Sequence, residues 1–315
     1  MFGSLTRKQR IQGGLWGLLI GDALGVPYEF HQPADLPPKA QLEMQPPSGF
    51  RRAHAGVPCG TWSDDGAQAL VLLASLLNQK GLQLEDFARR LINWYEHGYM
   101  AVDFRVFDVG VQTATAIRKL MAGIVPEQAG GVDVSANGNG SLMRVLPLAL
   151  WHQGTDEELV YLAQQQSLVT HRHLRSQVCC ALYCLWARGL LNEDDLAWEH
   201  AVTILRHIFG ENSEAYTELE LHIRPDEMPL GKGSGYVVDS LNSVRMVVLQ
   251  ENSYEDVVKA ALALGHDTDT TACIAGGLAG IKYGVHAIPE RWLQALRGKD
   301  LVEPLLADLL KSNYK

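Results

Sequence analysis

The stretch Gly265-His266-Asp267-Thr268-Asp269-Thr270 places two carboxylates and two hydroxyls within four consecutive residues. An alanine-rich segment precedes it, and residues 272–284, which are rich in glycine and alanine, follow it. Adjacent carboxylates repel each other. They are tolerated at the start of a helix, where free N–H groups and the helix dipole favour negative charge, or beside a bound cation. The pattern therefore indicates a helix start, a metal site, or both.

A second cluster of the same composition, Ser63-Asp64-Asp65, lies much earlier in the chain and also precedes an apolar helical pattern. For either cluster alone, acids that cap a helix and face solvent would be the better explanation. Two clusters that share acids and hydroxyls favour one metal site built from two distant segments. Oxygen ligands of this kind suit magnesium or manganese better than zinc or copper.

The bulk composition is that of an ordinary globular protein, with 315 residues, 47% of them hydrophobic and 20% charged. A formal net charge of −9 and scattered basic residues argue against nucleic acid or an anionic membrane as a partner. The apolar run at residues 15–20 is broken by Gly17 and ends before Asp22, which excludes a signal peptide or a membrane span. Five cysteines without a CxxC pair are typical of buried small hydrophobes in a reducing compartment, so we expect a cytoplasmic protein.

Helical periodicity dominates the chain. It predicts helices over residues 7–25, 65–79, 85–98, 106–122, 142–150, 156–168, 173–190, 194–209, 236–250, 254–264, 269–283 and 289–296. Long loops are expected at residues 31–60, which contain six prolines, and at residues 210–235. Glycines within the first helix indicate close backbone packing, because they cost helix propensity. No segment alternates convincingly as a strand would, so we predict an all-α fold in a single compact domain over residues 1–315.

The run Asp267-Thr268-Asp269-Thr270-Thr271 also fits D-x-D-x-T, the nucleophile motif of aspartyl-phosphate phosphatases. That chemistry needs the first aspartate at the end of a hydrophobic strand in a parallel sheet. The residues before Asp267 have a helical pattern instead, and strands and helices do not alternate around them. We therefore reject this interpretation of the motif.

Seven stretches, taken in order, resemble the ADP-ribosylglycohydrolase family, the group that includes the dinitrogenase-reductase-activating glycohydrolase. They are Gly21-Asp22-Ala23-Leu24-Gly25 through Glu29, Gly60-Thr61-Trp62-Ser63-Asp64-Asp65, Phe107-Asp108-Val109-Gly110, Asn137-Gly138-Asn139-Gly140-Ser141-Leu142-Met143-Arg144, Thr170-His171, Gly235-Tyr236-Val237-Val238-Asp239-Ser240-Leu241, and residues 265–283. One such motif would be weak, but seven in the family's order are highly specific. The resemblance implies an all-α, single-domain orthogonal helical bundle.

The resemblance also implies a site for two magnesium or manganese ions, with ADP-ribose bound in the cleft above them. By position, the metal ligands would be Ser63, Asp64, Asp65, Asp267, Asp269 and Thr270. The implied activity is hydrolysis of the glycosidic bond between ADP-ribose and a protein side chain, arginine being the first expectation, or a related ADP-ribosyl compound. An ADP-ribosylated protein or small conjugate is then the partner, and ADP-ribose is the product.

The glycine-rich loop at residues 130–141 is the expected backbone for ligand binding. Glycine allows close approach to a ligand, and the N–H groups of such a loop can face a pyrophosphate. The substrate-binding residues implied are Asn137, Gly138, Gly140, Ser141 and His171. Without the resemblance, an ordinary flexible turn would be the better explanation of the loop. His266 stands where the family often has glycine, so its side chain is expected to narrow the cleft or contact the substrate.

Two carboxylates are candidates for the proton chemistry. Glu29 stands where serine-linkage hydrolases of the family carry a catalytic glutamate, and Asp108 stands where the bacterial arginine-type members carry their proposed acid. Each has a plainer alternative: Glu29 as a group that orients a metal-bound water, and Asp108 as a hydrogen-bonding partner of a ribose hydroxyl. Arg144 could pair with a phosphate, but its place inside a predicted helix favours a bond to a buried acid such as Asp22.

Two rival functions remain open at this level. One is a non-catalytic protein that binds ADP-ribose or blocks a toxin by contact, against which the complete set of implied metal ligands argues. The other is a metal-dependent phosphohydrolase, which would release AMP and ribose phosphate in place of free ADP-ribose.

Overall fold

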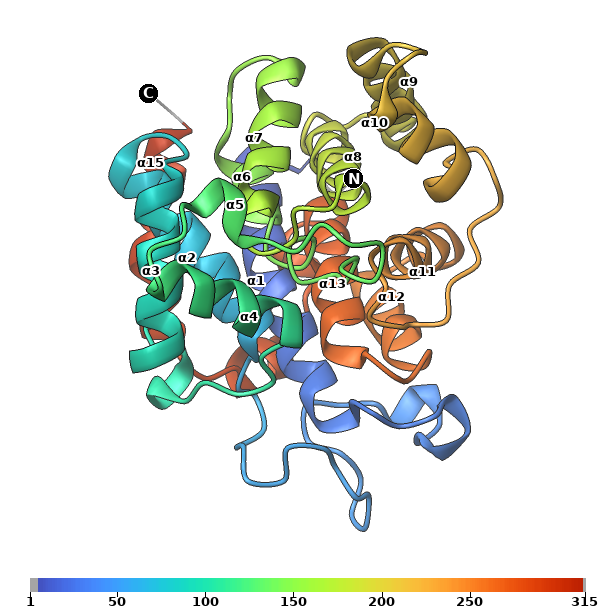
Figure 1. The fold of residues 1–315 in the computed structure, drawn as a ribbon. Coiled ribbons are helices and arrows are strands. Elements are labelled where there is room, and N and C mark those ends of the chain that lie inside the picture. Colours follow the sequence, from blue (N-terminus) through green and yellow to red (C-terminus); the bar gives the residue numbers. More distant parts are fainter. Residues whose placement is uncertain (1–4, 314–315) are drawn as a thin grey trace.

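The computed structural model describes residues 5–313, which form helices joined by loops and turns (Figure 1). The helices are α1 (Arg7–Gly25), α2 (Asp64–Gln79), α3 (Leu84–His97), α4 (Val111–Met121), α5 (Pro126–Ala129), α6 (Leu146–Trp151), α7 (Asp156–Leu168), α8 (Leu174–Leu191), α9 (Ala197–Phe209), α10 (Glu214–Thr217), α11 (Val237–Gln250), α12 (Tyr254–Leu262), α13 (Thr268–Tyr283), α14 (Glu290–Ala295) and α15 (Lys299–Ser312). Within the described residues, the β contacts are two isolated bridges, Gly131 with His171 and Gly138 with Tyr236. The predicted all-α fold is therefore confirmed.

Helices α1 and α13 run antiparallel through the centre, with their backbones in contact (Figure 1). A Cβ atom on Gly13 would lie 2.0 Å from the carbonyl oxygen of Gly280. At the other end of the pair, a Cβ atom on Gly25 would lie 2.2 Å from the Cα atom of Asp269. Glycines spaced by four on one face of α1 thus allow a helix contact that side chains would prevent. This contact places the end of α1 beside the start of α13, where Asp267 and Asp269 lie.

The start of α2 is fixed to α1 by a buried acid. Asp22 accepts hydrogen bonds from the backbone N–H groups of Ser63 (2.8 Å) and Gly66 (2.7 Å). A carboxylate at this position satisfies N–H groups that a helix start leaves free, and its charge is favoured by the helix dipole. A Cβ atom on Gly66 would lie 2.8 Å from Leu19, so the two helices also approach closely here. Three helix ends therefore meet at one place.

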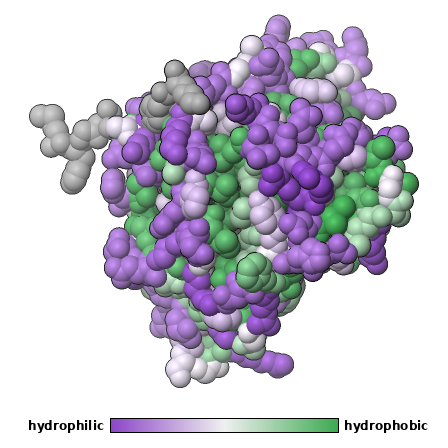
Figure 2. Space-filling view, turned by 90° about the vertical axis from the view of Figure 1, so that its left-hand side faces the viewer, coloured by the Kyte–Doolittle hydropathy of each residue, from purple (hydrophilic) through white to green (hydrophobic). Residues whose placement is uncertain are grey.

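The remaining helices surround this centre, and hydrophilic side chains predominate on the face that carries α3 and α15 (Figure 2). No helix among residues 5–313 combines the length and apolar character that a membrane crossing requires. The ends of the predicted domain, residues 1–4 and 314–315, lie outside the described residues.

Several helix predictions were wrong at their limits. The helix predicted at residues 106–122 begins only at Val111, because Asp108 has left-handed backbone dihedrals (φ 58°) that a helix cannot include. The helix predicted from residue 142 begins at Leu146. The loop predicted at residues 210–235 contains α10 and a π-helical turn, Glu218–Ile223. Helix α15 was not predicted, although its buried Val302, Leu306 and Leu309 recur at helical spacing around Pro304.

Candidate functional site

A cavity of about 840 Å³ opens where α1 ends and where α2 and α13 begin. Ten predicted site residues line it: Glu29, Asp64, Asp65, Asp108, Gly138, Gly140, His171, His266, Asp267 and Thr270. Residues that were not predicted line it as well, among them Phe30, Gln112, Asn139 and Lys232. The volume is in the range of pockets that enclose a small organic ligand.

The two acid-and-hydroxyl clusters meet beneath this cavity. The hydroxyl of Thr270 donates to Oδ2 of Asp65 (3.3 Å), and the hydroxyl of Ser63 donates to the same oxygen (3.2 Å). Ser63 also begins α2, because its Oγ accepts a hydrogen bond from the backbone N–H of Asp65. Two segments far apart in the sequence therefore contribute to one group of acids and hydroxyls, which we call the acid centre.

Several carboxylate oxygens in this centre are buried without a hydrogen-bond donor. Among the described residues, Oδ1 of Asp65 and both carboxylate oxygens of Asp269 have no partner. Carboxylate oxygens of Glu29, Asp267 and Asp269 all lie within 4.8 Å of one another. Burying unpaired carboxylates is costly unless a positive charge compensates them. Clustered carboxylate and hydroxyl oxygens fit a hard cation such as Mg²⁺ or Mn²⁺, so the residues present match the metal that the sequence implied.

The electrostatics of the acids agree with this fit. Burial, reinforced by neighbouring carboxylates, raises the pKa values of Asp64, Asp65 and Asp269 well above their usual range. Burial also raises the pKa of Asp22 to about 7, although the N–H groups that it accepts from oppose the shift. Without a cation, Asp64, Asp65 and Asp269 therefore bind protons more tightly than free carboxyl groups do, and a bound cation would favour their ionised form.

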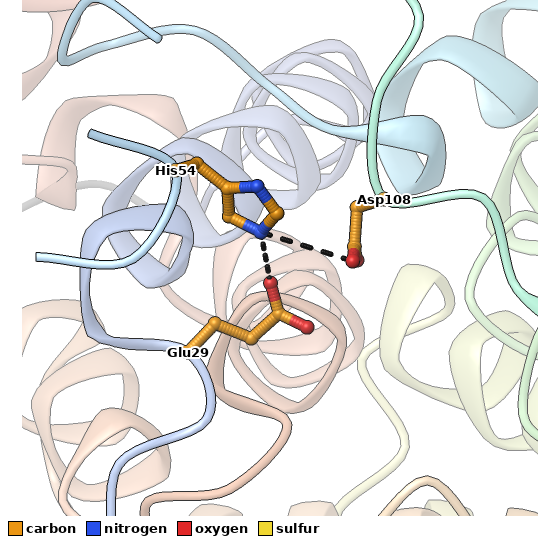
Figure 3. Close-up of side chains that lie close together, drawn as sticks. All are labelled: Glu29, His54 and Asp108. Atoms are coloured by element: carbon orange, nitrogen blue, oxygen red, sulfur yellow. Dashed lines mark hydrogen bonds and ion pairs between the residues drawn. The ribbon is translucent and has the colours of Figure 1, made fainter. Parts of the chain in front are cut away.

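Glu29 and Asp108 converge on one imidazole nitrogen, Nε2 of His54 (Figure 3). Nε2 of His54 lies 2.6 Å from Oε2 of Glu29 and 3.8 Å from Oδ1 of Asp108. Burial, followed by repulsion from Asp108 and Asp267, raises the pKa of Glu29 to about 11. Burial and the charge of Asp267 raise the pKa of Asp108 to about 6. His54 is absent from the residues predicted from the sequence, because it lies in a proline-rich loop without periodicity.

Gly138 and Gly140 bring the loop backbone to the cavity wall. A Cβ atom on Gly140 would lie 2.7 Å from Cε1 of His171, and one on Gly138 would lie 2.8 Å from Oε1 of Gln112. The loop backbone is also joined to a neighbouring segment: the N–H of Asn139 donates to the carbonyl oxygen of Gly235 (3.1 Å). The backbone here lies close to the cavity and is hydrogen-bonded to its neighbours.

The side chains of Asn137 and Ser141 turn away from the cavity. Oδ1 of Asn137 accepts from Ser176 (3.1 Å), and Oγ of Ser141 accepts from Ser167 (2.8 Å). Both side chains therefore hold the loop to the protein interior, and neither residue lines the cavity.

Asn139, which was not predicted, does face the acids. Its Nδ2 donates to Oδ2 of Asp267 (2.8 Å) and to the hydroxyl of Ser240 (3.0 Å). It therefore fixes the direction of one carboxylate in the centre. No sequence signal beyond its place between two glycines pointed to this role.

The two predicted histidines differ in their surroundings. His171 is buried, and burial together with the nearby Arg144 lowers its pKa to about 3, so its imidazole is neutral. Nδ1 of His171 lies 2.8 Å from the hydroxyl of Thr170. His266 has left-handed backbone dihedrals (φ 60°), and its N–H donates to the carbonyl oxygen of His31 (2.7 Å). This turn brings His266 into the cavity wall beside Asp267.

The expectation that Arg144 holds Asp22 was wrong. Arg144 is fully buried, and its guanidinium donates to the side-chain oxygens of Gln68 (2.9 Å) and Gln166 (3.1 Å). Gln68 in turn donates to Oδ2 of Asp64 (2.8 Å). Asp22 is already satisfied by backbone N–H groups at the start of α2, so Arg144 supports the acid centre indirectly, through Gln68.

Comparison with known proteins agrees with this geometry. A model of the family described as ADP-ribosylglycohydrolase matches residues 4–315. The chain is 30% identical to the ADP-ribosylarginine hydrolase Tri1 of Pseudomonas putida (strain GB-1), over 97% of this chain and 80% of that protein. It is 28% identical to the ADP-ribosyl-dinitrogen reductase glycohydrolase of Rhodospirillum rubrum, over 91% of this chain and 90% of that one.

A solved structure described as an ADP-ribosylglycohydrolase-related protein complex matches with a TM-score of 0.77 and 28% identity. The match covers 97% of this chain and 98% of that one. Sequence and fold thus agree over nearly the whole chain, and the protein belongs to the ADP-ribosylglycohydrolase family.

Proposed function

We propose that the chain is a metal-dependent hydrolase that releases ADP-ribose from modified arginine side chains and so reverses ADP-ribosylation. Family membership supports the hydrolase class. The arginine linkage is supported by the relative from Pseudomonas putida, which is named an ADP-ribosylarginine hydrolase. The observation that carries the proposal is the meeting of two acid-and-hydroxyl clusters beneath one cavity, with buried carboxylate oxygens that lack donors.

The proposed ligands of two Mg²⁺ or Mn²⁺ ions are Ser63, Asp64, Asp65, Asp267, Asp269 and Thr270. When bound, such ions supply positive charge and Lewis acidity at this end of the cleft. The protein's own part is to hold the ligands in place. Asn139 orients Asp267, and Gln68, which is itself held by Arg144, orients Asp64. Supporting partners of this kind typically affect metal affinity or activity by about 10–100-fold.

The substrate would lie along the glycine loop. The backbone at Gly138 and Gly140 suits the approach of a pyrophosphate, because no Cβ atom blocks it. The N–H groups of Gly138 and Asn139 donate to Gln112 and Gly235, so the closest approach is expected at Gly140. Neutral His171 can donate or accept one hydrogen bond to the ligand without adding charge. We propose that Asn137 and Ser141 act through the shape of the loop, and that His266 narrows the cleft beside Asp267.

We assign the proton chemistry to Glu29 and Asp108. A pKa of about 6 lets Asp108 exchange a proton near neutral pH, which suits an acid or base in the reaction. Glu29 keeps its proton in the metal-free cleft. Both side chains border the cavity next to the acid centre, so either is within the reach of a sugar bound there.

The proposed function is tested with ADP-ribosyl conjugates of arginine, serine and cysteine, incubated with and without Mg²⁺. We expect Mg²⁺-dependent release of free ADP-ribose, fastest from the arginine conjugate. Release of AMP and ribose phosphate would indicate a phosphohydrolase instead. Binding of ADP-ribose without cleavage of any conjugate would indicate a binding or toxin-immunity protein.

We also propose that residues 1–315 act as one domain and that the protein works in the cytoplasm. One cluster of buried apolar side chains, contributed by helices from α1 to α15, supports the single domain. All five cysteines are free thiols, as a reducing compartment would leave them.

A further inference from the structure

We propose that His54 is a positioning residue, which fixes the carboxyl group of Glu29 in the cleft by a hydrogen bond from the loop at residues 31–60. The inference rests on the proposed function, because it concerns one of the acids assigned to the proton chemistry there. Figure 3 shows Nε2 of the imidazole directed at Glu29, with Asp108 farther away on the same side of the ring.

The contact between the two side chains is a short hydrogen bond. Nε2 of His54 and Oε2 of Glu29 lie 2.6 Å apart, whereas the 3.8 Å to Asp108 is too long for one. The imidazole N–H is the donor when Glu29 is ionised, and the carboxyl O–H is the donor when Glu29 is protonated. The contact therefore holds in both states of the acid. Asp65, Asp108 and Asp267 repel the Glu29 carboxylate, so a neutral imidazole is suited to hold it in place.

His54 is itself held before any substrate binds. Its ring packs against the rings of Phe30 (5.7 Å between centroids) and Phe107 (5.1 Å). Its backbone has left-handed dihedrals (φ 47°), which non-glycine residues adopt where the surroundings require them. Only 17% of its side chain is exposed. The ring direction is thus determined by packing.

The loop that carries His54 is tied to the two segments that carry the acids. The N–H of Ala53 donates to the carbonyl oxygen of Pro27 (2.9 Å), just before Glu29. The guanidinium of Arg105 donates to the carbonyl oxygen of Gly56 (2.6 Å), just before the segment of Asp108. These two hydrogen bonds therefore help to hold the imidazole in place relative to both acids.

A cation site is the competing explanation, because ligand atoms of His54, Glu29 and Asp108 lie within 4.8 Å of one another. Two ligands with metal bonds of about 2.0–2.1 Å at tetrahedral angles lie about 3.3 Å apart. The 2.6 Å between His54 and Glu29 is shorter than this and fits a direct hydrogen bond. Counting bound Mn²⁺ in the experiment separates the two explanations.

The test measures single-turnover cleavage of an ADP-ribosylarginine conjugate by the full chain at saturating Mg²⁺. We expect His54→Ala to lower the rate by about tenfold or more, with the affinity for ADP-ribose and the number of bound Mn²⁺ ions unchanged. His54→Gln should restore most of the rate, because its amide can donate to the same carboxylate. Gln32→Ala is the control, since Gln32 lies in the same loop and is exposed.

A double-mutant cycle makes the test specific. In the Glu29→Gln background, His54→Ala should cause no further loss, because it acts through Glu29. Equal losses in both backgrounds, an unchanged rate for His54→Ala in the wild type, or the loss of a bound Mn²⁺ would overturn the assignment. A wild type that cleaves no conjugate would refute the proposed function separately. In that case, the unfolding temperatures of the same four proteins decide the inference. If the changes caused by His54→Ala and Glu29→Gln do not add in the double variant, the contact is supported, and if they add, it is overturned.

Discussion

The hydroxyl of Thr270 donates a hydrogen bond of 3.3 Å to the carboxylate of Asp65, which joins the starts of α13 and α2 across 205 positions of sequence. This contact depends on the glycine face of α1, against which α13 packs without intervening side chains. It also depends on Asp22, which fixes the start of α2. The acid centre is therefore a direct consequence of how the central helices pack.

The unpartnered carboxylate of Asp269 should be the most sensitive point of the metal site. We expect Asp269→Asn to abolish tight Mn²⁺ binding and to reduce turnover by at least about a hundredfold. Without metal, the same variant should unfold at a temperature equal to or above that of the wild type, because a buried unpaired acid has been removed. Titration calorimetry and thermal unfolding measure both effects. Asp308→Asn, on the exposed face of α15, is the control and should change neither.

Metal binding should depend on pH with a defined sign. The raised pKa values of Asp64, Asp65 and Asp269 mean that protons compete with a cation for these acids in the metal-free protein. The increase in unfolding temperature caused by Mg²⁺ should therefore grow as the pH rises from about 5 to about 7.5. Comparing samples with and without Mg²⁺ at each pH removes the contribution of the buried histidines to the pH dependence of the unfolding temperature. A pH-independent increase would show that these acids do not bind the ion.

The approach of the glycine loop to the ligand can be tested at Gly140. A methyl group there would lie 2.7 Å from His171, so Gly140→Ala should displace the imidazole and weaken ADP-ribose binding by about tenfold or more. Because the loop is packed, a larger residue would disturb the fold as well. Gly81→Ala is the matched control, since its Cβ atom would meet nothing within 4 Å. Equal ADP-ribose affinity in both variants would remove the loop from the site.

The leaving group should decide which acid dominates. A serine alkoxide needs a proton as it departs, whereas a protonated guanidine leaves more readily. Positioned acid–base groups are worth about 10²–10⁴-fold. On an arginine conjugate, we expect Asp108→Asn to cost at least as much rate as Glu29→Gln, with metal retained in both. On an O-linked conjugate, Glu29→Gln should cost more. Near-wild-type turnover of the arginine conjugate by Asp108→Asn would show that the role belongs to another group.

Much of the centre could be predicted from local sequence patterns. Acids before an apolar helical period indicated both helix starts, and glycines within residues 7–25 indicated the close contact that brings them together. The predicted helix limits were wrong where a backbone conformation has no local pattern in the sequence. The left-handed dihedrals of Asp108 are one case.

The residues that were not predicted depend on the paths of loops. His54 reaches Glu29 from a proline-rich segment, and Asn139 reaches Asp267 across 128 positions of sequence. No periodicity or residue spacing in the sequence predicts either contact, because each is determined by tertiary structure. Arg144 was assigned to the wrong acid for the same reason: the sequence does not show that Gln68 stands between it and Asp64.

The central claim is that the joined acid clusters form a metal site on which hydrolysis of the ADP-ribosyl bond depends. The most direct test measures turnover of an ADP-ribosylarginine conjugate before exhaustive chelation, after it, and after Mg²⁺ is returned. The account predicts that turnover is lost on chelation and restored by Mg²⁺ in the wild type, but not in Asp269→Asn. Full turnover by the thoroughly chelated wild type would contradict it.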